Sequence, residues 1–166
     1  ENPEMFEGFV EVAKGAGYKA VRELAEARYA YGKDMKMFEG FVEVAKIRGE
    51  EMISVLIKAS SVYKENPEMF EGFVEVAKGA GYDAVSELAK ASSVYGKDMK
   101  MFKEFVETAN SECKKCDELI PSSIDRSRSG AIKLQVLAEA SSVYKENPEM
   151  FEGFVEVAKI RGEEMI

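Results

Sequence analysis

The chain has 166 residues, of which 46% are apolar and 33% are charged, and its formal net charge is −8. Such a composition can fold in water, but an acidic chain argues against general nucleic-acid binding, because phosphate contacts need an excess of Lys and Arg. No stretch of about 18 apolar residues occurs, so we expect no membrane-spanning helix. The chain also has no His, the commonest general base and metal ligand. We therefore expect no enzyme and no cofactor.

One 14-residue string recurs along the sequence with few changes. The string Glu-Asn-Pro-Glu-Met-Phe-Glu-Gly-Phe-Val-Glu-Val-Ala-Lys occurs at 1–14, 65–78 and 146–159, and a variant occupies 33–46. Its Met-Phe pair recurs at steps of 32, 32, 32 and 49 residues. Self-similarity at a fixed spacing is typical of stacked repeats, in which neighbouring units share a core. We expect one array over 1–166, with units at 1–32, 33–64, 65–96, 97–145 (a unit with a 17-residue insertion) and 146–166 (a partial unit).

Each repeat unit begins with a signal for a helix. Asn2 precedes Pro3 in the first unit, and Asp34 or Asp98 takes the capping position in the alternate units. The apolar residues that follow cover an arc of about 160° on a helix of 3.6 residues per turn. In the first unit these residues are Met5, Phe6, Phe9, Val10, Val12 and Ala13. The width of the arc predicts a helix that packs on both its hairpin partner and its neighbours.

A second helix is predicted in each unit, after glycines that end the first. In the first unit, Gly15 and Gly17 are expected to end the first helix. The apolar spacing that follows predicts a buried face made of Tyr18, Val21, Leu24, Ala25, Arg28 and Tyr31. Two helices of about 12 to 14 residues joined by short loops form an αα-hairpin.

These hairpins resemble the αα-solenoid class, which includes tetratricopeptide and HEAT repeats, and the resemblance covers the whole chain. It is a resemblance of architecture, because the period of 32 residues is short and the Trp-Leu-Gly-Tyr pattern of tetratricopeptide repeats is missing. It implies an all-α fold, a right-handed αα-hairpin solenoid of about 4.5 units.

A glycine interrupts the first helix of four units, at Gly8, Gly40, Gly72 and Gly153. An interior glycine costs a helix about 1 kcal/mol relative to Ala. One interpretation is that the missing side chain lets a neighbouring helix approach closely. The other is that the glycine was copied with the repeat and matters little. The fourth unit has Glu104 at this position.

Pairs of glutamates recur on the outer face of the first helix, and we take them as candidate partner-binding residues. The pairs in the first three units are Glu7 and Glu11, Glu39 and Glu43, and Glu71 and Glu75. They could hold a basic or periodic partner, or they could simply keep an exposed helix in water. Units 1–32 and 65–96 agree at 26 of 32 positions, so such an array could read only a uniform ligand.

The insertion in the fourth unit extends the pattern of its first helix. Apolar residues continue with helical spacing from Phe102 to Ile120, and Pro121 follows. This spacing predicts one unbroken helix, with the second helix starting near Ser122 or Ser123 in a long hairpin. Its buried face would include Ile124, Ala131, Leu134 and Leu137. The alternative is a disordered loop over Ser122–Gly130 and a second helix that starts near Ala131.

The same insertion holds the only cysteines, Cys113 and Cys116. A Cys-x-x-Cys pair can supply half of a zinc site or a redox pair. No other Cys or His exists to complete a metal site, so these are weak metal candidates and can equally be core thiols. Four nearby cations are candidates for docking an acidic partner, or for a solvated tip: Lys114, Lys115, Arg126 and Arg128.

The sequence favours a non-catalytic helical-repeat scaffold that mediates protein–protein interaction. The alternatives are a structural array that associates with itself end to end, an engineered or consensus-like repeat protein and, more remotely, a metal or thiol site at the cysteine pair. The expected partner is therefore another protein or a second copy of this chain. The chain is also expected to be a piece of a longer array, and the cytoplasm is the favoured compartment.

Overall fold

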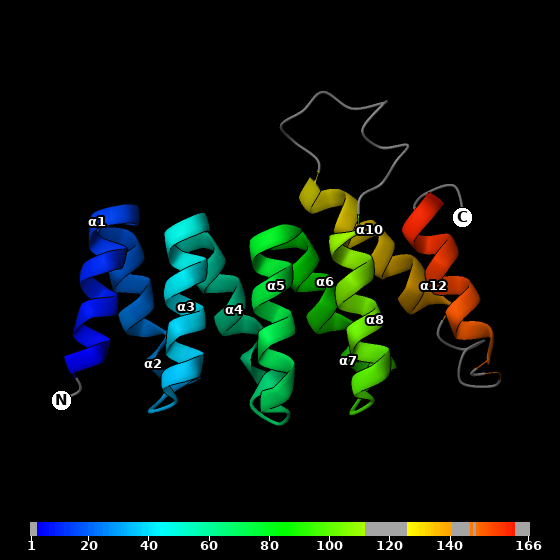
Figure 1. The fold of residues 1–166 in the computed structure, drawn as a ribbon, viewed down its shortest axis with the longest axis horizontal. Coiled ribbons are helices and arrows are strands. Elements are labelled where there is room, and N and C mark those ends of the chain that lie inside the picture. The colour runs from blue at the N-terminus through cyan, green and yellow to red at the C-terminus, as the bar shows by residue number, and fades with distance from the viewer. Residues whose placement is uncertain (1–2, 112–125, 141–146, 148, 162–166) are drawn as a thin grey trace. The chain divides into compact units, whose positions relative to one another are not determined.

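The computed structural model describes residues 3–111, 126–140, 147 and 149–161 (Figure 1). Within these ranges every regular element is a helix and no strand occurs, which confirms the all-α expectation. None of the described helices is long and apolar enough to cross a membrane. The chain divides into two compact bodies, Glu1–Lys78 (the N-terminal body) and Gly79–Ile166 (the C-terminal body).

The N-terminal body contains helices that succeed one another in hairpins. They are α1 (Pro3–Glu26), α2 (Arg28–Tyr31), α3 (Met35–Arg48), α4 (Glu50–Tyr63), the 3₁₀ turn η1 (Pro67–Met69) and α5 (Phe70–Gly79), whose last residue falls in the other body. Helix α1 contacts α3 and α4, and α3 packs on α4. In Figure 1, α1, α3 and α5 lie side by side, with α2 and α4 behind them. The first helices of successive repeat units thus form one layer of this body.

Helix α1 is in fact two helices joined at a kink. Gly17 has φ 82° and ψ −176°, a conformation that only glycine adopts readily, whereas Gly15 is still helical. The first helix of the hairpin therefore ends at Gly17, the second of the two glycines that the sequence suggested. The second helix is interrupted again at Ala27, before α2.

The predicted aspartate caps are present. Asp34 Oδ1 accepts a hydrogen bond from the Met37 amide at 3.1 Å, and Asp98 Oδ1 accepts one from the Met101 amide at 3.0 Å. At the start of the third unit, Asn66 makes no such side-chain bond, and the chain enters α5 through the 3₁₀ turn η1. The Asn-Pro signal therefore starts a helix without the predicted cap.

The predicted wide apolar arc is confirmed in α3, where all six positions are buried: Met37, Phe38, Phe41, Val42, Val44 and Ala45. In α1 only Val12 of the six is buried, and Phe6 is 69% exposed. Val12 and Val44 are both fully buried, whereas Val157, at the same register, is 39% exposed, and no second helix is described after it. The part of the arc that contains Val12 in α1 and Val44 in α3 therefore faces the helix's own hairpin partner. The part that contains Phe38 in α3 packs on the preceding helix, and Phe6 occupies the same position in α1.

A buried tyrosine joins each of three hairpins to the next repeat unit. The hydroxyls of Tyr31, Tyr63 and Tyr95 donate to the carbonyl oxygens seven residues earlier, at 3.0, 2.6 and 2.7 Å. The Tyr31 ring also lies edge-on to Phe38 and Phe41, with ring centroids 5.1 and 5.7 Å away. Burial raises the pKa of all three phenols.

The predicted buried face of the second helix was partly wrong. Tyr18 is 80% exposed and both Ala25 and Arg28 are exposed. Leu24 and Tyr31 are buried, as predicted, and they form the buried stripe together with Ala20 and Ala27. Tyr18 lies two residues before Ala20, about 200° around the helix, so it points away from this stripe.

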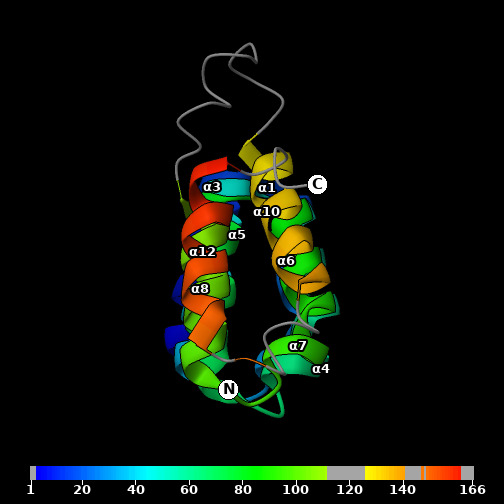
Figure 2. The ribbon, with the colours of Figure 1, turned by 90° about the vertical axis from the view of Figure 1, so that its right-hand side faces the viewer.

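The C-terminal body contains α6 (Tyr82–Lys90), α7 (Ser92–Tyr95), α8 (Met99–Asn110), α10 (Arg126–Glu139) and α12 (Glu149–Arg161). Helix α10 contacts α6, α8 and α12. Figure 2 shows α8 and α12 in one layer and α6 and α10 in the other. The layering of first and second helices thus recurs on both sides of the insertion.

The prediction of an unbroken helix from Phe102 to Ile120 is wrong. Helix α8 ends at Asn110, and Ser111 has extended backbone angles, φ −65° and ψ 140°. The Ser111 amide and hydroxyl both donate to the Thr108 carbonyl, at 3.3 and 2.8 Å. A serine that binds a nearby carbonyl competes with the helical hydrogen bonds, and here this bonding ends the helix.

Helix α10 is described from Arg126, so the alternative that the second helix starts near Ala131 is wrong. The predicted start near Ser122 or Ser123 lies outside the described residues. Ala131, Leu134 and Leu137 are buried, as predicted, and Ile124 lies outside the described residues.

Candidate interaction surfaces

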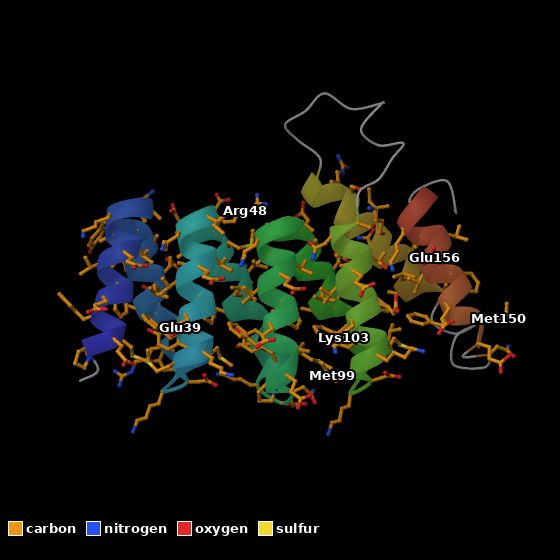
Figure 3. All side chains as sticks on the ribbon, viewed as in Figure 1. Glu39, Arg48, Met99, Lys103, Met150 and Glu156 are labelled. Atoms are coloured by element: carbon orange, nitrogen blue, oxygen red, sulfur yellow. The ribbon has the colours of Figure 1, made fainter. Side chains whose placement is uncertain are left out.

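Three glutamates form an exposed acidic ladder on the N-terminal body. Glu7 on α1, Glu39 on α3 and Glu71 on α5 occupy the same register in successive repeat units. Figure 3 labels Glu39 on α3. No ion pair involves any of the three within the described part of the chain. We call Glu7, Glu39 and Glu71 the acidic ladder.

The second glutamate behaves differently in two of the three pairs, because a lysine of the next repeat unit binds it. Lys46 Nζ lies 2.9 Å from Glu11 Oε2, and Lys78 Nζ lies 2.8 Å from Glu43 Oε2. A hydrogen bond and the charge of Lys46 lower the pKa of Glu11. Glu75 is exposed. Glu11 and Glu43 thus bridge successive repeat units, a role that sequence reasoning missed although Lys recurs at the required spacing.

The lysine–glutamate contact between the first helices of successive units also joins α8 and α12, which precede and follow the insertion in the C-terminal body. Lys159 Nζ lies 3.2 Å from Glu107 Oε2 and 3.5 Å from Glu104 Oε2. Partial burial lowers the pKa of Lys159, but the bonds and charges of these two carboxylates outweigh it and raise that pKa. Phe105 and Phe151 also stack, with centroids 6.4 Å apart. Helices α8 and α12 therefore meet in the usual register, although 49 residues separate equivalent positions.

Two of the interior glycines are sites of close helix packing. A Cβ atom on Gly8 would lie 2.7 Å from Phe38 Cε1, and one on Gly40 would lie 2.6 Å from Phe70 Cε1. This confirms the close-approach interpretation at both positions. Around Gly153, no described atom lies within 4 Å of a Cβ position, so this notch in α12 is open.

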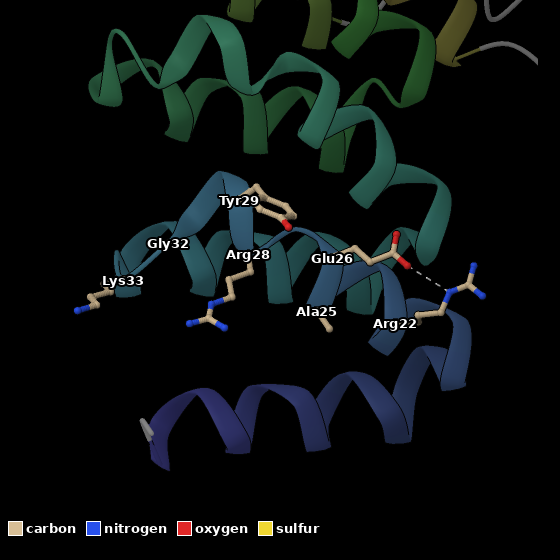
Figure 4. Close-up of a pocket in the computed structure, with 7 residues that line it drawn as sticks. All are labelled: Arg22, Ala25, Glu26, Arg28, Tyr29, Gly32 and Lys33. Atoms are coloured by element: carbon tan, nitrogen blue, oxygen red, sulfur yellow. Dashed lines mark ion pairs between the residues drawn. The ribbon is translucent and has the colours of Figure 1, made fainter.

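An open hollow on the N-terminal body was not predicted. It has a volume of about 680 Å³ and is lined by Arg22, Ala25, Glu26, Arg28, Tyr29, Gly32 and Lys33 (Figure 4). Arg22 Nε lies 3.6 Å from Glu26 Oε1, and Tyr29 is 88% exposed. The available signal was a departure from the repeat, since Arg28 and Tyr29 replace the serines of the next unit, Ser60 and Ser61.

A buried lysine in the C-terminal body was also missed. Lys133 is 1% exposed, and its Nζ donates to the Ser111 carbonyl at 2.5 Å and the Ser111 hydroxyl at 3.0 Å. The equivalent residue in the third unit is Ala84, which is also fully buried. The ammonium group lies at the C-terminal end of α8, where a cation complements the helix dipole. Lys133 therefore stabilises the C-terminal end of α8.

The candidates in the insertion remain predictions. Cys113, Cys116, Lys114 and Lys115 lie outside the described residues, as does the Arg126 side chain, and Arg128 is exposed. Within the described ranges, no group of three or more Cys, Asp or Glu residues is arranged to hold a metal ion.

Comparison with known proteins gives no match to a family model, a curated protein or a solved structure.

Proposed function

We propose that this chain is a non-catalytic scaffold, a right-handed αα-hairpin solenoid with a 32-residue period, that binds a basic protein segment along its acidic ladder. The observation that carries the proposal is the reuse of one contact between repeat units. Phe38 sits on Gly8 as Phe70 sits on Gly40, and Lys46 reaches Glu11 as Lys78 reaches Glu43. A contact that repeats at the period of the sequence is what a stacked array requires.

The charges on the first-helix layer favour a basic partner. Lysines offset Glu11 and Glu43, whereas no ion pair within the described residues offsets the acidic ladder. The chain as a whole has a net charge of −8. A cationic segment would supply the missing counter-charges, and complementary charges also speed association.

The spacing of the ladder suggests which cationic segment fits. Packed helices lie about 8 to 10 Å apart, so successive ladder carboxylates should be separated by about that distance. A polyproline II segment has three residues per turn and advances about 3.1 Å per residue, so a cation at every third residue lies on one face and matches the ladder. The proposed ligand is therefore an extended segment of the type Lys-x-x-Lys-x-x-Lys.

A labelled synthetic peptide tests the proposal through fluorescence anisotropy. The probe is Lys-Ser-Ser-Lys-Ser-Ser-Lys, and its control has the same composition with the three lysines adjacent. We expect the spaced peptide to bind more tightly. Replacing Glu7, Glu39 and Glu71 with Gln should weaken its binding about tenfold, since each exposed pair contributes up to about 1 kcal/mol.

A second triple variant controls for net charge. Glu51, Glu65 and Glu68 are exposed in the same body but lie outside the ladder, and their replacement with Gln removes the same three charges. We expect this variant to bind the spaced peptide almost as well as the unmodified protein. Equal losses in the two triple variants, or equal binding of the two peptides, would show unspecific charge attraction and refute the ladder.

A further inference from the structure

We propose that copies of this chain join head to tail, with α1 of one copy docking on α12 of another. This inference rests on the repeat packing of the proposed function but uses different residues from the acidic ladder. It commits to a second copy of the chain, because the two halves of one internal contact are both exposed, one on α1 and the other on α12.

The first half is the face of α1 that contains Phe6 and Lys14. Phe6 is 69% exposed, whereas its equivalents Phe38 and Phe151 are 1% and 6% exposed. Lys14 is exposed as well, whereas its equivalent Lys46 bonds to a glutamate of the preceding helix. This face of α1 therefore lacks, within the described residues, the neighbour that covers the same face of α3.

The second half is the open face of α12. Gly153 has no described atom within 4 Å of a Cβ position, and Glu156 is exposed. Figure 3 labels Glu156 on α12. In α1 and α3 the same two registers are occupied, because Gly8 and Gly40 receive phenylalanine rings and Glu11 and Glu43 receive lysines.

The two halves fit because residues 4–14 and 149–159 have the same sequence. Docking would place the Phe6 ring on Gly153 and the Lys14 ammonium on Glu156, which repeats the contact that α5 makes with α3. Each copy would use one face for each neighbour. Such a heterologous contact leaves one free face at each end of an assembly, so growth does not stop at a symmetric pair and gives rings or open chains.

Sedimentation over a range of about 5 to 500 µM provides the first test. We expect the weight-average mass to rise with concentration and to pass the mass of two chains. A mass of one chain throughout the range would overturn the proposal. A plateau at two chains would also overturn it, because it would indicate a symmetric contact instead.

Two variants, one for each face, test the residues. Phe6→Ser removes the exposed ring, and Gly153→Leu fills the notch, so each should raise the dissociation constant at least about tenfold. The controls are Tyr29→Ser, which removes a ring that is 88% exposed elsewhere, and Gly15→Leu, which adds a side chain in open space. The equivalent of Gly15 in α3 is Ile47, which is 58% exposed. Equal weakening by the controls would refute docking at these faces.

A mixture of the two variants gives the sharpest result. Phe6→Ser retains an intact α12 face, and Gly153→Leu retains an intact α1 face. We therefore expect each variant alone to sediment as one chain and their equimolar mixture to form pairs that stop at two chains. A mixture that behaves like its components would overturn the head-to-tail geometry.

Charge reversal gives an independent check. Lys14→Glu and Glu156→Lys should each weaken association, and the double variant should recover it, since the ion pair is then rebuilt with its ends exchanged. No recovery in the double variant would remove this pair from the interface. The acidic-ladder variant should assemble normally, so loss of assembly and loss of peptide binding can be told apart.

Discussion

The two helices α1 and α12 contain the same eleven residues, Glu-Met-Phe-Glu-Gly-Phe-Val-Glu-Val-Ala-Lys, yet they bury opposite parts of their apolar arc. In α1, Val12 is fully buried and Phe6 is 69% exposed. In α12, Phe151 and Ala158 are buried and Val157 is 39% exposed. The α5 region, with the same sequence again, buries both parts. The residues define the arc, and the neighbours of each helix decide which part of it is covered.

The largest predicted effect on stability compares two phenylalanines at the same repeat position, Phe38 in α3 and Phe6 in α1. Phe38→Ala should destabilise the protein by about 3 to 5 kcal/mol, because it empties a site packed by Gly8, Phe9 and Tyr31. Phe6→Ala should cost less than about 1 kcal/mol, because the ring is largely in water. Urea unfolding followed by circular dichroism measures both. Equal losses would show that Phe6 is covered as fully as Phe38, which contradicts the prediction.

The next effect differs in sign between two glycines. Gly40→Ala should destabilise by about 1 to 3 kcal/mol, since its Cβ atom would lie 2.6 Å from a ring carbon of the buried Phe70. Gly153→Ala should stabilise by up to about 1 kcal/mol, because the new methyl group meets open space and alanine favours a helix. The same urea titrations test the pair. Destabilisation at both positions would contradict the open notch in α12.

A third prediction concerns the contrast between Lys133 in α10 and its equivalent in α4, the buried Met52. Lys133→Met keeps the length of the side chain but leaves the Ser111 carbonyl without the donated hydrogen bond. We expect a loss of about 1 to 3 kcal/mol, the usual cost of an unsatisfied buried group. Hydrogen exchange should then increase at the C-terminal end of α8. Unchanged exchange there would mean that Lys133 does not hold the end of the helix.

The buried tyrosines predict that the protein becomes less stable in alkali. Burial raises the folded-state pKa of Tyr31, Tyr63 and Tyr95 above the ordinary value of 10. Their contribution is therefore complete below pH 10 and is lost as the pH rises above it, because the unfolded chain releases protons that the folded chain retains. Melting curves between pH 8 and pH 11.5 measure the decline. Tyr63→Phe should make it shallower, and an identical slope in this variant would contradict the prediction.

The smallest effect is expected for the lysines. Lys46→Gln removes the exposed pair with Glu11 and should cost about 0.2 to 1 kcal/mol in low salt, and less in 1 M salt. Lys14→Gln, at the same register in α1, should change the stability of dilute protein very little. Thermal melting at two salt concentrations distinguishes them, and a larger loss for Lys14 would reverse the assignment of the two faces.

Much of the local structure could be predicted from the residues. The caps Asp34 and Asp98, the six buried positions of α3 and the break inside α1 at Gly17 all follow from local chemistry and helical spacing. The insertion was harder to predict. Its apolar spacing indicated one long helix, but a side-chain bond of Ser111 ends α8, and spacing alone cannot weigh that competition.

The candidate site, too, could be predicted only in part from the sequence. The sequence identified the recurring glutamate pairs of the outer face, but it could not separate Glu7 and Glu39 from Glu11 and Glu43. Only the packed helices bring Lys46 within 2.9 Å of Glu11, and the lysine lies 35 residues away in the chain. Lys133 gave no signal, because a lysine within an amphipathic segment is normally exposed.

By itself, then, the sequence determined most of the helices and their aspartate caps, since these depend on contacts within a few residues. The tertiary structure decided how equivalent residues are used. Gly81 adopts φ 94° between two helices, whereas Gly130, its equivalent after the 49-residue step, lies inside α10. A Cβ atom there would lie 2.8 Å from the Ala109 carbonyl oxygen and 3.0 Å from Ala80 Cβ. The same residue makes a turn in one hairpin and a close helix contact in the other, because contacts between helices depend on which segments the fold brings together.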